Sequence, residues 1–457
     1  MRRILAIAGL AVRAAIRSRL VVCLLVLLLA IVAGLPRVVQ GDGTPDGYVR
    51  ITIGYTMGLA SLVLSLTALW AGALSISREV ADKQIQTLCS KPVRRIEIWF
   101  GKWLGLSAVH VALLGLSALA TYVTLYRAIH SDRFTDEQRH HLQTDVLTAR
   151  RPLHPPPPDV ERAARAELQQ RMERGLLPEG MDPAATLQNL RQEMLMQALA
   201  IPPGGQLAWT FPLPPDLDPA AGLRLSFRFS TSRLGIQPAR GTWLAGPPQG
   251  APLFRITATN NPGSVHTLEL PAASAAGGSA LVVRYINDDP EPFTLLFAPR
   301  DGLVLHIPAG GFAANFSRAV ALTAFRLALL VAIGLTAGTL FSTPVAAFMA
   351  LAGMIVLQLG GYVGSLARQE QLTPWSLLGG AEPGPADAIM RMLFKLMDQL
   401  LAPLQTGRPL DDAALGILVD PAVVAQAGIV HLVIYGGLLA VLAGACFNRR
   451  ELALPTS

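Results

Sequence analysis

The chain has 457 residues, of which 51% are hydrophobic and 15% are charged, and its mean hydropathy is positive. Soluble globular chains carry about a quarter charged residues, so this composition favours an integral membrane protein over a soluble one. The formal net charge of +7 could indicate a nucleic-acid-binding protein, but this charge lies in membrane-flanking segments, which excludes that class.

Six apolar blocks are long enough for membrane-spanning helices, which need roughly 17–25 residues. They are, in chain order, Leu20–Leu35, Ile51–Ile76, Trp103–Tyr126, Ala319–Phe341, Val345–Ala367 and Gln426–Phe447. The first block is not expected to be a cleaved signal peptide, because no small-residue cleavage pattern follows it and further spans do. We therefore predict an α-helical integral membrane protein with six transmembrane helices.

Positive charge is concentrated in three short segments that flank these blocks: 1–20, 77–102 and the tail after Phe447. Together they hold thirteen Lys and Arg but only four acids, whereas segment 127–318 holds eighteen Arg and eighteen acids. Positively charged residues are retained on the cytoplasmic side of a membrane. We therefore predict that both termini and segment 77–102 are cytoplasmic and that residues 127–318 are extracytoplasmic.

The first twenty residues combine apolar side chains with five arginines. This pattern is typical of an interfacial helix on the cytoplasmic leaflet, and a plain basic flank that only sets the topology is an equal alternative. With the first three spans, this segment makes up an N-terminal domain of residues 1–126.

The large outer segment divides by pattern into two domains, residues 127–204 and 205–318. The first is polar and has helical candidates at Asp136–Thr148, Val160–Arg174 and Pro183–Leu199. The second contains about seven short alternating or β-rich runs separated by Pro, Gly, Asn and Asp clusters. We predict an extracytoplasmic α+β region in which residues 205–318 form a jelly-roll-like β-sandwich.

The C-terminal domain, residues 319–457, contains the last three spans and a second outer segment. Residues 385–403 place six apolar side chains on one stripe of a helix and charged side chains off it. This helix is too polar to span a membrane, so we expect it at the outer interface.

Chemical motifs of self-contained enzymes do not occur in this sequence. It has no GxxxxGK[ST] phosphate loop, no HExxH, no CxxC pair and no GxSxG elbow. His140, His141 and His154 are interpreted as solvated residues, and Asn315 matches a glycosylation acceptor that lies too close to a span to be used. We therefore predict no catalytic residue, no metal site and no cofactor in this chain.

The cytoplasmic segment 77–102 has signals for two short helices. Ser77 is expected to cap a helix from Arg78 to about Leu88, with Glu79 in its first turn. Lys91-Pro92 ends that helix, and a second helix is expected to begin there and continue into the third span. Such an element could fill a groove on a cytoplasmic partner.

This segment resembles the cytoplasmic loop of ABC-2 type transporter permeases, with the pattern E-R-E-x-G-T-[LI]-x-x-L-x-x-x-P-[VI]-S-R-x-x-x-x-x-G-K. The matching residues are Glu79, Ile85, Leu88, Pro92, Val93, Arg95, Gly101 and Lys102. Lys83-Gln84 and Arg94 depart from the pattern. Three other segments also resemble the family: AVRAAIRSRL before the first span, FSTPVAAF after the fourth and the ending FNRRELALP. The resemblance does not extend to the outer domains.

The resemblance implies an exporter in which a separate ATPase binds ATP and Mg²⁺ beneath two permease halves. The residues expected to contact that ATPase are Glu79, Asp82, Ile85, Leu88, Pro92 and Arg95. Arg326 and Gln358 are candidates for the translocation path, although Arg326 could instead extend its side chain towards the outer surface. The expected partners are a cytoplasmic ABC ATPase, a second permease subunit, identical or different, and membrane lipid, with no nucleic acid.

From the sequence we expect the transmembrane permease subunit of an ABC-2 exporter in a bacterial cytoplasmic membrane. Arg-rich, Ala-rich and Lys-poor usage favours a bacterial source with a GC-rich genome. The alternative is a non-transporting membrane anchor whose outer β-sandwich binds an envelope polymer or protein.

Overall fold

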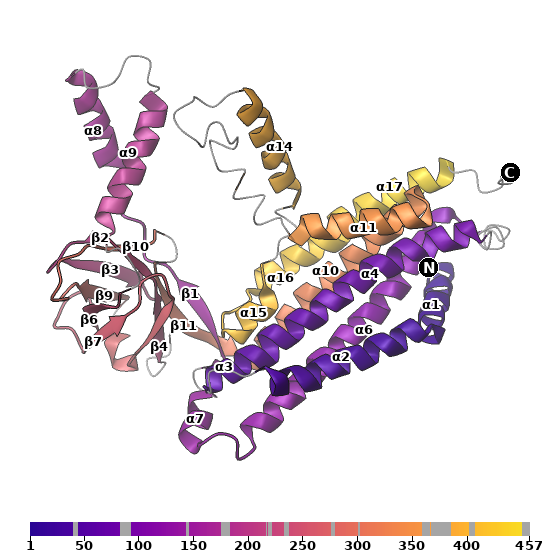
Figure 1. Ribbon diagram of the computed structural model, residues 1–457, viewed down its shortest axis with the longest axis horizontal. Helices are drawn as coiled ribbons and strands as arrows, with labels where there is room; N and C mark the ends of the chain where they lie inside the picture. The colour runs from indigo at the N-terminus through magenta and orange to yellow at the C-terminus, as the bar shows by residue number, and fades with distance from the viewer. Residues whose placement is uncertain are drawn as a thin grey trace. The chain divides into compact units, whose positions relative to one another are not determined.

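The computed structural model describes residues 1–39, 44–82, 93–142, 146–174, 183–215, 217, 222–232, 237–275, 279–299, 302–358, 366, 385–401 and 407–449. The chain divides into two compact units (Figure 1). The helical unit comprises Met1–Leu147 and Gly311–Ser457, and the β unit comprises Thr148–Gly310. The β unit is thus an insertion in the sequence of the helical unit.

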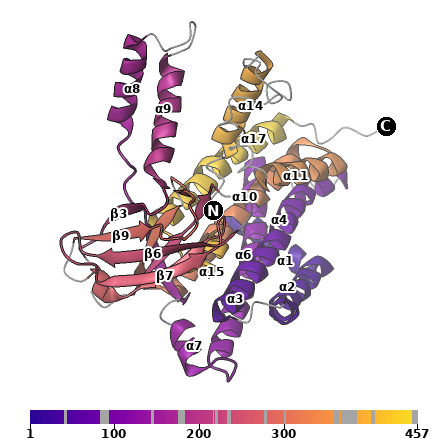
Figure 2. The same ribbon diagram turned by 60° about the vertical axis from the view of Figure 1, so that its left-hand side comes forward.

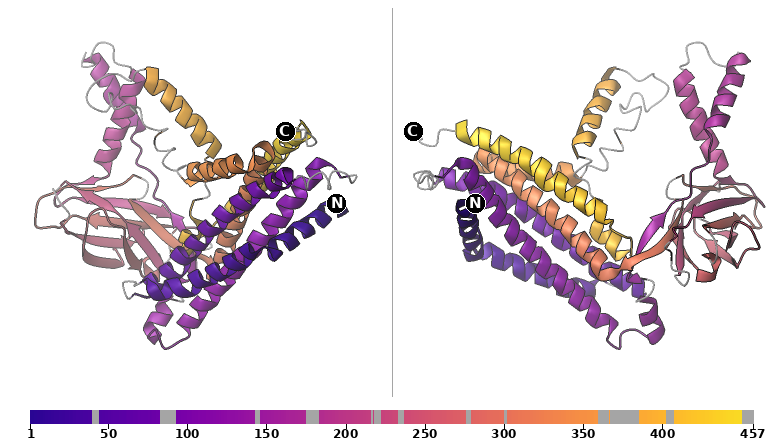
Figure 3. Two further views of the ribbon diagram at one scale, coloured as in Figure 1. Left: turned by 45° about the vertical axis from the view of Figure 1, so that its right-hand side comes forward. Right: turned by 180° about the vertical axis from the view of Figure 1, so that it is seen from behind.

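The helical unit is built from long apolar helices joined by short helical turns. Its elements are α1 (Arg2–Arg17), α2 (Arg19–Val38), α3 (Pro45–Arg50), η1 (Ile51–Tyr55), α4 (Thr56–Ala81), α6 (Arg95–Ile129), α7 (Asp136–His141), α10 (Phe312–Leu340), α11 (Thr343–Gln358), α14 (Pro385–Leu401), α15 (Pro409–Ala414), α16 (Pro421–Gly428), η5 (Ile429–Tyr435) and α17 (Gly436–Arg449). Figure 3 shows the long helices lying side by side.

Five continuous helices in the described part of the chain are long and apolar enough to cross a membrane. They are Val21–Val38, Pro45–Ala81, Arg95–Ile129, Phe312–Leu340 and Pro421–Arg449. The remaining predicted span, Val345–Ala367, begins within α11, but most of its second half lies outside the described residues. The membrane-embedded helical region is confirmed, and the count of six spans stays a prediction.

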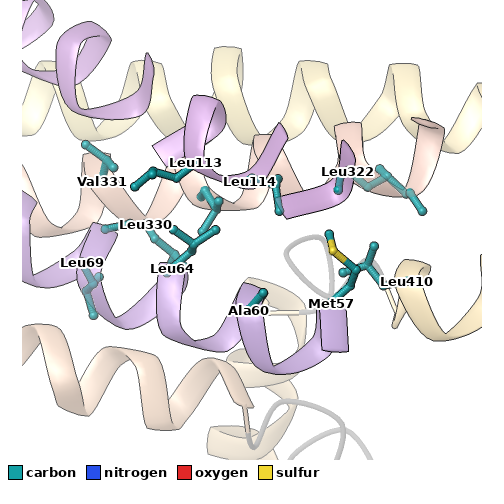
Figure 4. Packing of buried hydrophobic residues seen from close by; sticks show 14 of the residues in the cluster. Met57, Ala60, Leu64, Leu69, Leu113, Leu114, Leu322, Leu330, Val331 and Leu410 are labelled. Carbon is teal, nitrogen blue, oxygen red and sulfur yellow. The ribbon is translucent and has the colours of Figure 1, made fainter. Parts of the chain in front are cut away.

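Glycines, among them Gly334 and Gly338 of α10, bring α4 and α10 into close contact. A Cβ added at Gly72 would lie 2.7 Å from the carbonyl oxygen of Val331, closer than real Cβ atoms approach. Small residues allow this approach, and the close contact of the two helix backbones adds dispersion energy. Leu64, Leu330 and neighbouring side chains continue the interface (Figure 4). Gly58 of α4 does not pack in this way, because a Cβ added there would meet open space.

The predicted helix start at Ser77 is wrong. Helix α4 runs without a break from Thr56 to Ala81, and the Ser77 hydroxyl donates to the carbonyl oxygen of Ala73, 2.8 Å away. Ser77 is buried within the helical unit. A serine that bonds back to the preceding turn satisfies its hydroxyl inside a helix and does not need to cap a new one.

The β unit has eleven described strands arranged in three sheets. The strands are β1 (Thr148–Leu153), β2 (Ala200–Ile201), β3 (Gln206–Pro212), β4 (Leu223–Phe227), β5 (Phe229–Thr231), β6 (Ala239–Gly246), β7 (Phe254–Asn260), β8 (His266–Leu270), β9 (Ala280–Ile286), β10 (Leu295–Phe297) and β11 (Leu303–Gly311). The strand orders are β1-β11-β4-β8, β2-β10-β5 and β3-β9-β6-β7. Two helices, α8 (Glu161–Glu173) and α9 (Pro183–Ala198), precede most of the strands and pack against each other (Figure 2).

Alternating burial along the strands explains the core of the β unit. In β4 every second residue is buried, so that Leu223, Leu225 and Phe227 all face inward. The Phe227 ring lies 4.5 Å, between centroids, from Trp243 on β6, which belongs to a different sheet. Two sheets therefore share one aromatic core, and the predicted β-rich region is confirmed.

The chain enters and leaves the β unit through neighbouring strands. Strands β1 and β11 are adjacent in their sheet. A Cβ added at Gly310 would lie 4.0 Å from the Cβ of Ala149, so residues at the two ends of the unit lie close to each other.

Candidate functional site at the ends of helices α4 and α6

The ends of α4 and α6 flank the loop that the sequence predicts to contact an ATPase. Helix α4 ends at Ala81 and α6 begins at Arg95, and residues 83–92 lie outside the described residues. The geometry of the site therefore comes from the two helix ends that hold this loop.

An ion pair joins the two helices one to two turns away from the loop. Lys102 Nζ on α6 lies 2.6 Å from the Oε1 atom of Glu79 on α4. The same ammonium group donates to Ser75, with its carbonyl oxygen at 2.8 Å and its Oγ at 3.1 Å. The Lys102 side chain is only 6% exposed, whereas that of Glu79 is 28% exposed. A buried ammonium needs such partners, so this contact fixes the spacing of the two helix ends.

The first turn of α6 has its own local bonds. Arg94 is the N-cap, and its backbone N–H donates to the Glu97 carboxylate at 2.9 Å. The acid is also favourable at the positive end of the helix dipole. Arg95 reaches α17, where its guanidinium donates to the carbonyl oxygen of Phe447 and lies 5.7 Å from the centroid of the Phe447 ring.

Helix α1 crosses the same region of α6. A Cβ added at Gly101 would lie 2.6 Å from the Cβ of Ile7, and one added at Gly105 would lie 2.7 Å from the carbonyl oxygen of Ala8. Ile7 and Ala8 are accordingly the buried residues of α1. The first segment of the chain is therefore a helix packed against the site, and its predicted position at the membrane interface stays a prediction.

The structure places three of the six predicted contact residues at the ends of α4 and α6, and the other three lie outside the described residues. Glu79 faces Lys102, Asp82 is exposed at the end of α4, and Arg95 contacts α17. Ile85, Leu88 and Pro92, the apolar and helix-breaking part of the prediction, lie outside the described residues.

The two candidate residues for a translocation path lie on different helices. Arg326 on α10 lines a cavity of about 380 Å³, together with Ser61 and Ser65 of α4 and Arg408 and Asp411 near α15. Gln358 is the last residue of α11, and the position of its side chain lies outside the described residues. The cavity gives Arg326 polar neighbours within the helical unit.

The contacts of two polar residues, Lys102 and Asn315, were not predicted from the sequence. Lys102 was noted only as part of the family pattern, and its partner Glu79 is 23 residues away. Asn315 is buried, and its amide donates to Ile417 O at 2.7 Å while its Oδ1 accepts from Val419 N at 2.7 Å. This side chain fastens the segment between α15 and α16 to α10, and burial makes it inaccessible to glycosylation.

Comparison with known protein families identifies the part of the chain that contains this site. Residues 5–135 match the family model described as ABC-2 family transporter protein. This range covers α1, α2, α4, α6 and the connection between α4 and α6. No curated protein matches the chain. Together with the apolar helices, the match confirms the resemblance and identifies a membrane protein with an ABC-2 transporter domain.

Proposed function

We propose that this chain, whose residues 5–135 are an ABC-2 family transporter domain, is the permease subunit of an exporter in a bacterial cytoplasmic membrane. A separate cytoplasmic ATPase supplies the energy, and a second permease subunit, identical or different, completes the pathway. The sequence contains no phosphate loop, so the proposal assigns ATP and Mg²⁺ to the partner.

The observation that carries this proposal is the contact between α4 and α6, the two helices that flank segment 83–92 within the matched domain. The preceding helix, α4, contacts α10 along a glycine-lined interface, and the following helix, α6, is tied to α4 by Lys102 and Glu79. A force applied to the loop therefore reaches two spanning helices directly. The loop carries Ile85 and Leu88, which are suited to a groove on a partner.

Export further requires a route for the substrate through the helical unit. The cavity beside Arg326, with its serine and arginine side chains, is proposed as part of that route. Ionisable residues inside membrane segments are costly and commonly mark ion or substrate pathways. Gln358 is proposed as a second polar position on the route.

The proposal is tested by disrupting the predicted contact between Ile85 and Leu88 and the ATPase. The chain is coexpressed with an ABC ATPase encoded beside its gene, and copurification and ATP hydrolysis are measured. Ile85→Asp with Leu88→Asp should abolish copurification and permease-dependent hydrolysis, because two charges cannot enter an apolar groove. The matched control is Val265→Asp in the β unit, where the side chain is 67% exposed and the same change should have no effect.

Three results would contradict the proposal. The first is ATP hydrolysis by the purified chain alone, and the second is wild-type stimulation of the ATPase by the double variant. The third is the failure of any ATPase to copurify while the β unit retains an envelope polymer, which would favour the membrane-anchor alternative.

A further inference from the structure

A cavity of about 680 Å³ lies beside the candidate coupling site, where α1, α2, α4 and α6 meet. One wall is the contact between α1 and α6, closed by the tight packing of Ile7 and Ala8 against Gly101 and Gly105. Another wall is α2, which departs from α1 at Ser18, the residue in an extended conformation between the two helices. Figure 1 shows α1 set at an angle to α2 as a result.

Four arginines are among the residues that line this cavity. Arg13 and Arg17 come from α1, Arg19 begins α2, and Arg78 lies near the end of α4. All four are exposed, and among the described residues none of them forms an ion pair. The acidic lining residue, Glu79, is already paired with Lys102. The lining therefore carries an excess of positive charge that the described residues do not neutralise.

The rest of the lining is mostly apolar, and it also includes Ser18, Ser75, His110 and the ion pair of Glu79 with Lys102. Leu24 of α2 and Leu106, Val109 and Leu113 of α6 continue the cavity along the spanning helices. At 1.5 Å of rise per residue, the lining from Lys102 to Leu113 extends about 16 Å along α6. That length corresponds to roughly half of the hydrocarbon thickness of a bilayer.

We propose that this cavity binds a phospholipid with an anionic headgroup. The phosphate and its substituent lie against Arg13, Arg17, Arg19 and Arg78, and an acyl chain lies along Leu106, Val109 and Leu113. A basic pocket between spanning helices attracts anionic headgroups, and each buried methylene adds affinity. A free phosphate or a soluble anion would use the arginines but leave the apolar wall empty, so the two-part lining favours a lipid.

The bound lipid would connect α1 to the candidate coupling site. Helix α1 supplies two of the four arginines, and its residues Ile7 and Ala8 pack on α6 close to Lys102. This inference requires only that the protein is embedded in a membrane. It does not depend on the export function proposed above.

The test uses the full chain purified in a neutral detergent and stripped of lipid. Dioleoyl phosphatidylglycerol, dioleoyl phosphatidylcholine or inorganic phosphate is added, and bound lipid is counted by native mass spectrometry alongside the melting temperature. Phosphatidylglycerol should be retained at least tenfold more strongly than phosphatidylcholine and should raise the melting temperature, because a ligand that binds only the folded state stabilises it. Phosphate alone should do neither.

Variants locate the site. Arg13→Gln with Arg17→Gln should reduce phosphatidylglycerol retention at least tenfold, and each single change at least threefold if the double variant does not purify intact. Val109→Trp should also reduce retention by filling the apolar wall without changing charge. The matched control is Arg2→Gln with Arg37→Gln, two exposed arginines outside the cavity lining.

Equal retention of the two lipids would overturn the proposal. So would stabilisation by phosphate as large as that by phosphatidylglycerol, or unchanged retention in the Arg13 and Arg17 variants. A control variant that loses as much lipid as the test variant would show unspecific charge attraction and would overturn it as well.

Discussion

Replacing Glu79 by Gln should destabilise the helical unit through the lysine that it faces. The change keeps the size of the side chain but removes the negative charge 2.6 Å from Lys102 Nζ. The Lys102 side chain is only 6% exposed, so water solvates it poorly when its partner is removed. Removing one partner of a fully buried ion pair costs about 3–5 kcal/mol.

Two features of the site reduce that cost. Glu79 is 28% exposed, so water already screens part of the attraction, and Lys102 keeps its two hydrogen bonds to Ser75. We therefore expect a loss of about 2–3 kcal/mol in the free energy of unfolding for Glu79→Gln. Lys102→Met should recover part of this loss in the double variant, because it removes the charge that has been left alone.

The assay is reversible unfolding of the detergent-solubilised chain in mixed micelles of increasing denaturing detergent, followed by circular dichroism. The wild type, both single variants and the double variant form a double-mutant cycle, with an expected coupling of about 1–3 kcal/mol. Glu79→Gln within about 0.5 kcal/mol of the wild type, or strictly additive single effects, would refute the reasoning from burial.

Two further predictions concern the β unit and the topology. Burial, followed by the nearby Arg224, Arg150 and His154, lowers the pKa of His306 to about 4 from its ordinary value near 6.5. The neutral form of His306 therefore contributes stability that is complete above about pH 6.5 and is lost as the pH falls towards 4, by about 2–3 kcal/mol in all. His306→Gln should remove this part of the pH dependence when unfolding is measured across an acid titration. A membrane-impermeant thiol reagent added to intact spheroplasts should leave Cys89 unlabelled and should label a cysteine introduced as Ser232→Cys; the reverse pattern would invert the predicted topology.

The helical unit was predictable where length and composition decide the outcome. A block of about twenty apolar residues has few alternatives to a helix in a membrane protein, because every backbone group must find its partner within the segment. The helix α14 followed equally from the spacing of its apolar residues, and its proposed place at the outer interface stays a prediction.

The site was less predictable because its contacts join distant parts of the chain. Ser77 has a strong local preference for an N-cap, but the packing of α4 keeps the helix continuous and its hydroxyl bonds to Ala73. No local pattern pairs Lys102 with Glu79 or Asn315 with Val419. Such pairs depend on which helices become neighbours in the fold, and local patterns in a single sequence do not reveal those neighbours.

The adjacency of β1 and β11 makes the β unit separable from its host. Since Ala149 and Gly310 are in contact, removing the inserted unit leaves a gap that one short turn can close. The β unit therefore interrupts the sequence of the helical unit at one place, between Leu147 and Gly311. Because its two ends lie close together, the surface of the β unit can change in evolution without altering the contacts between the helices.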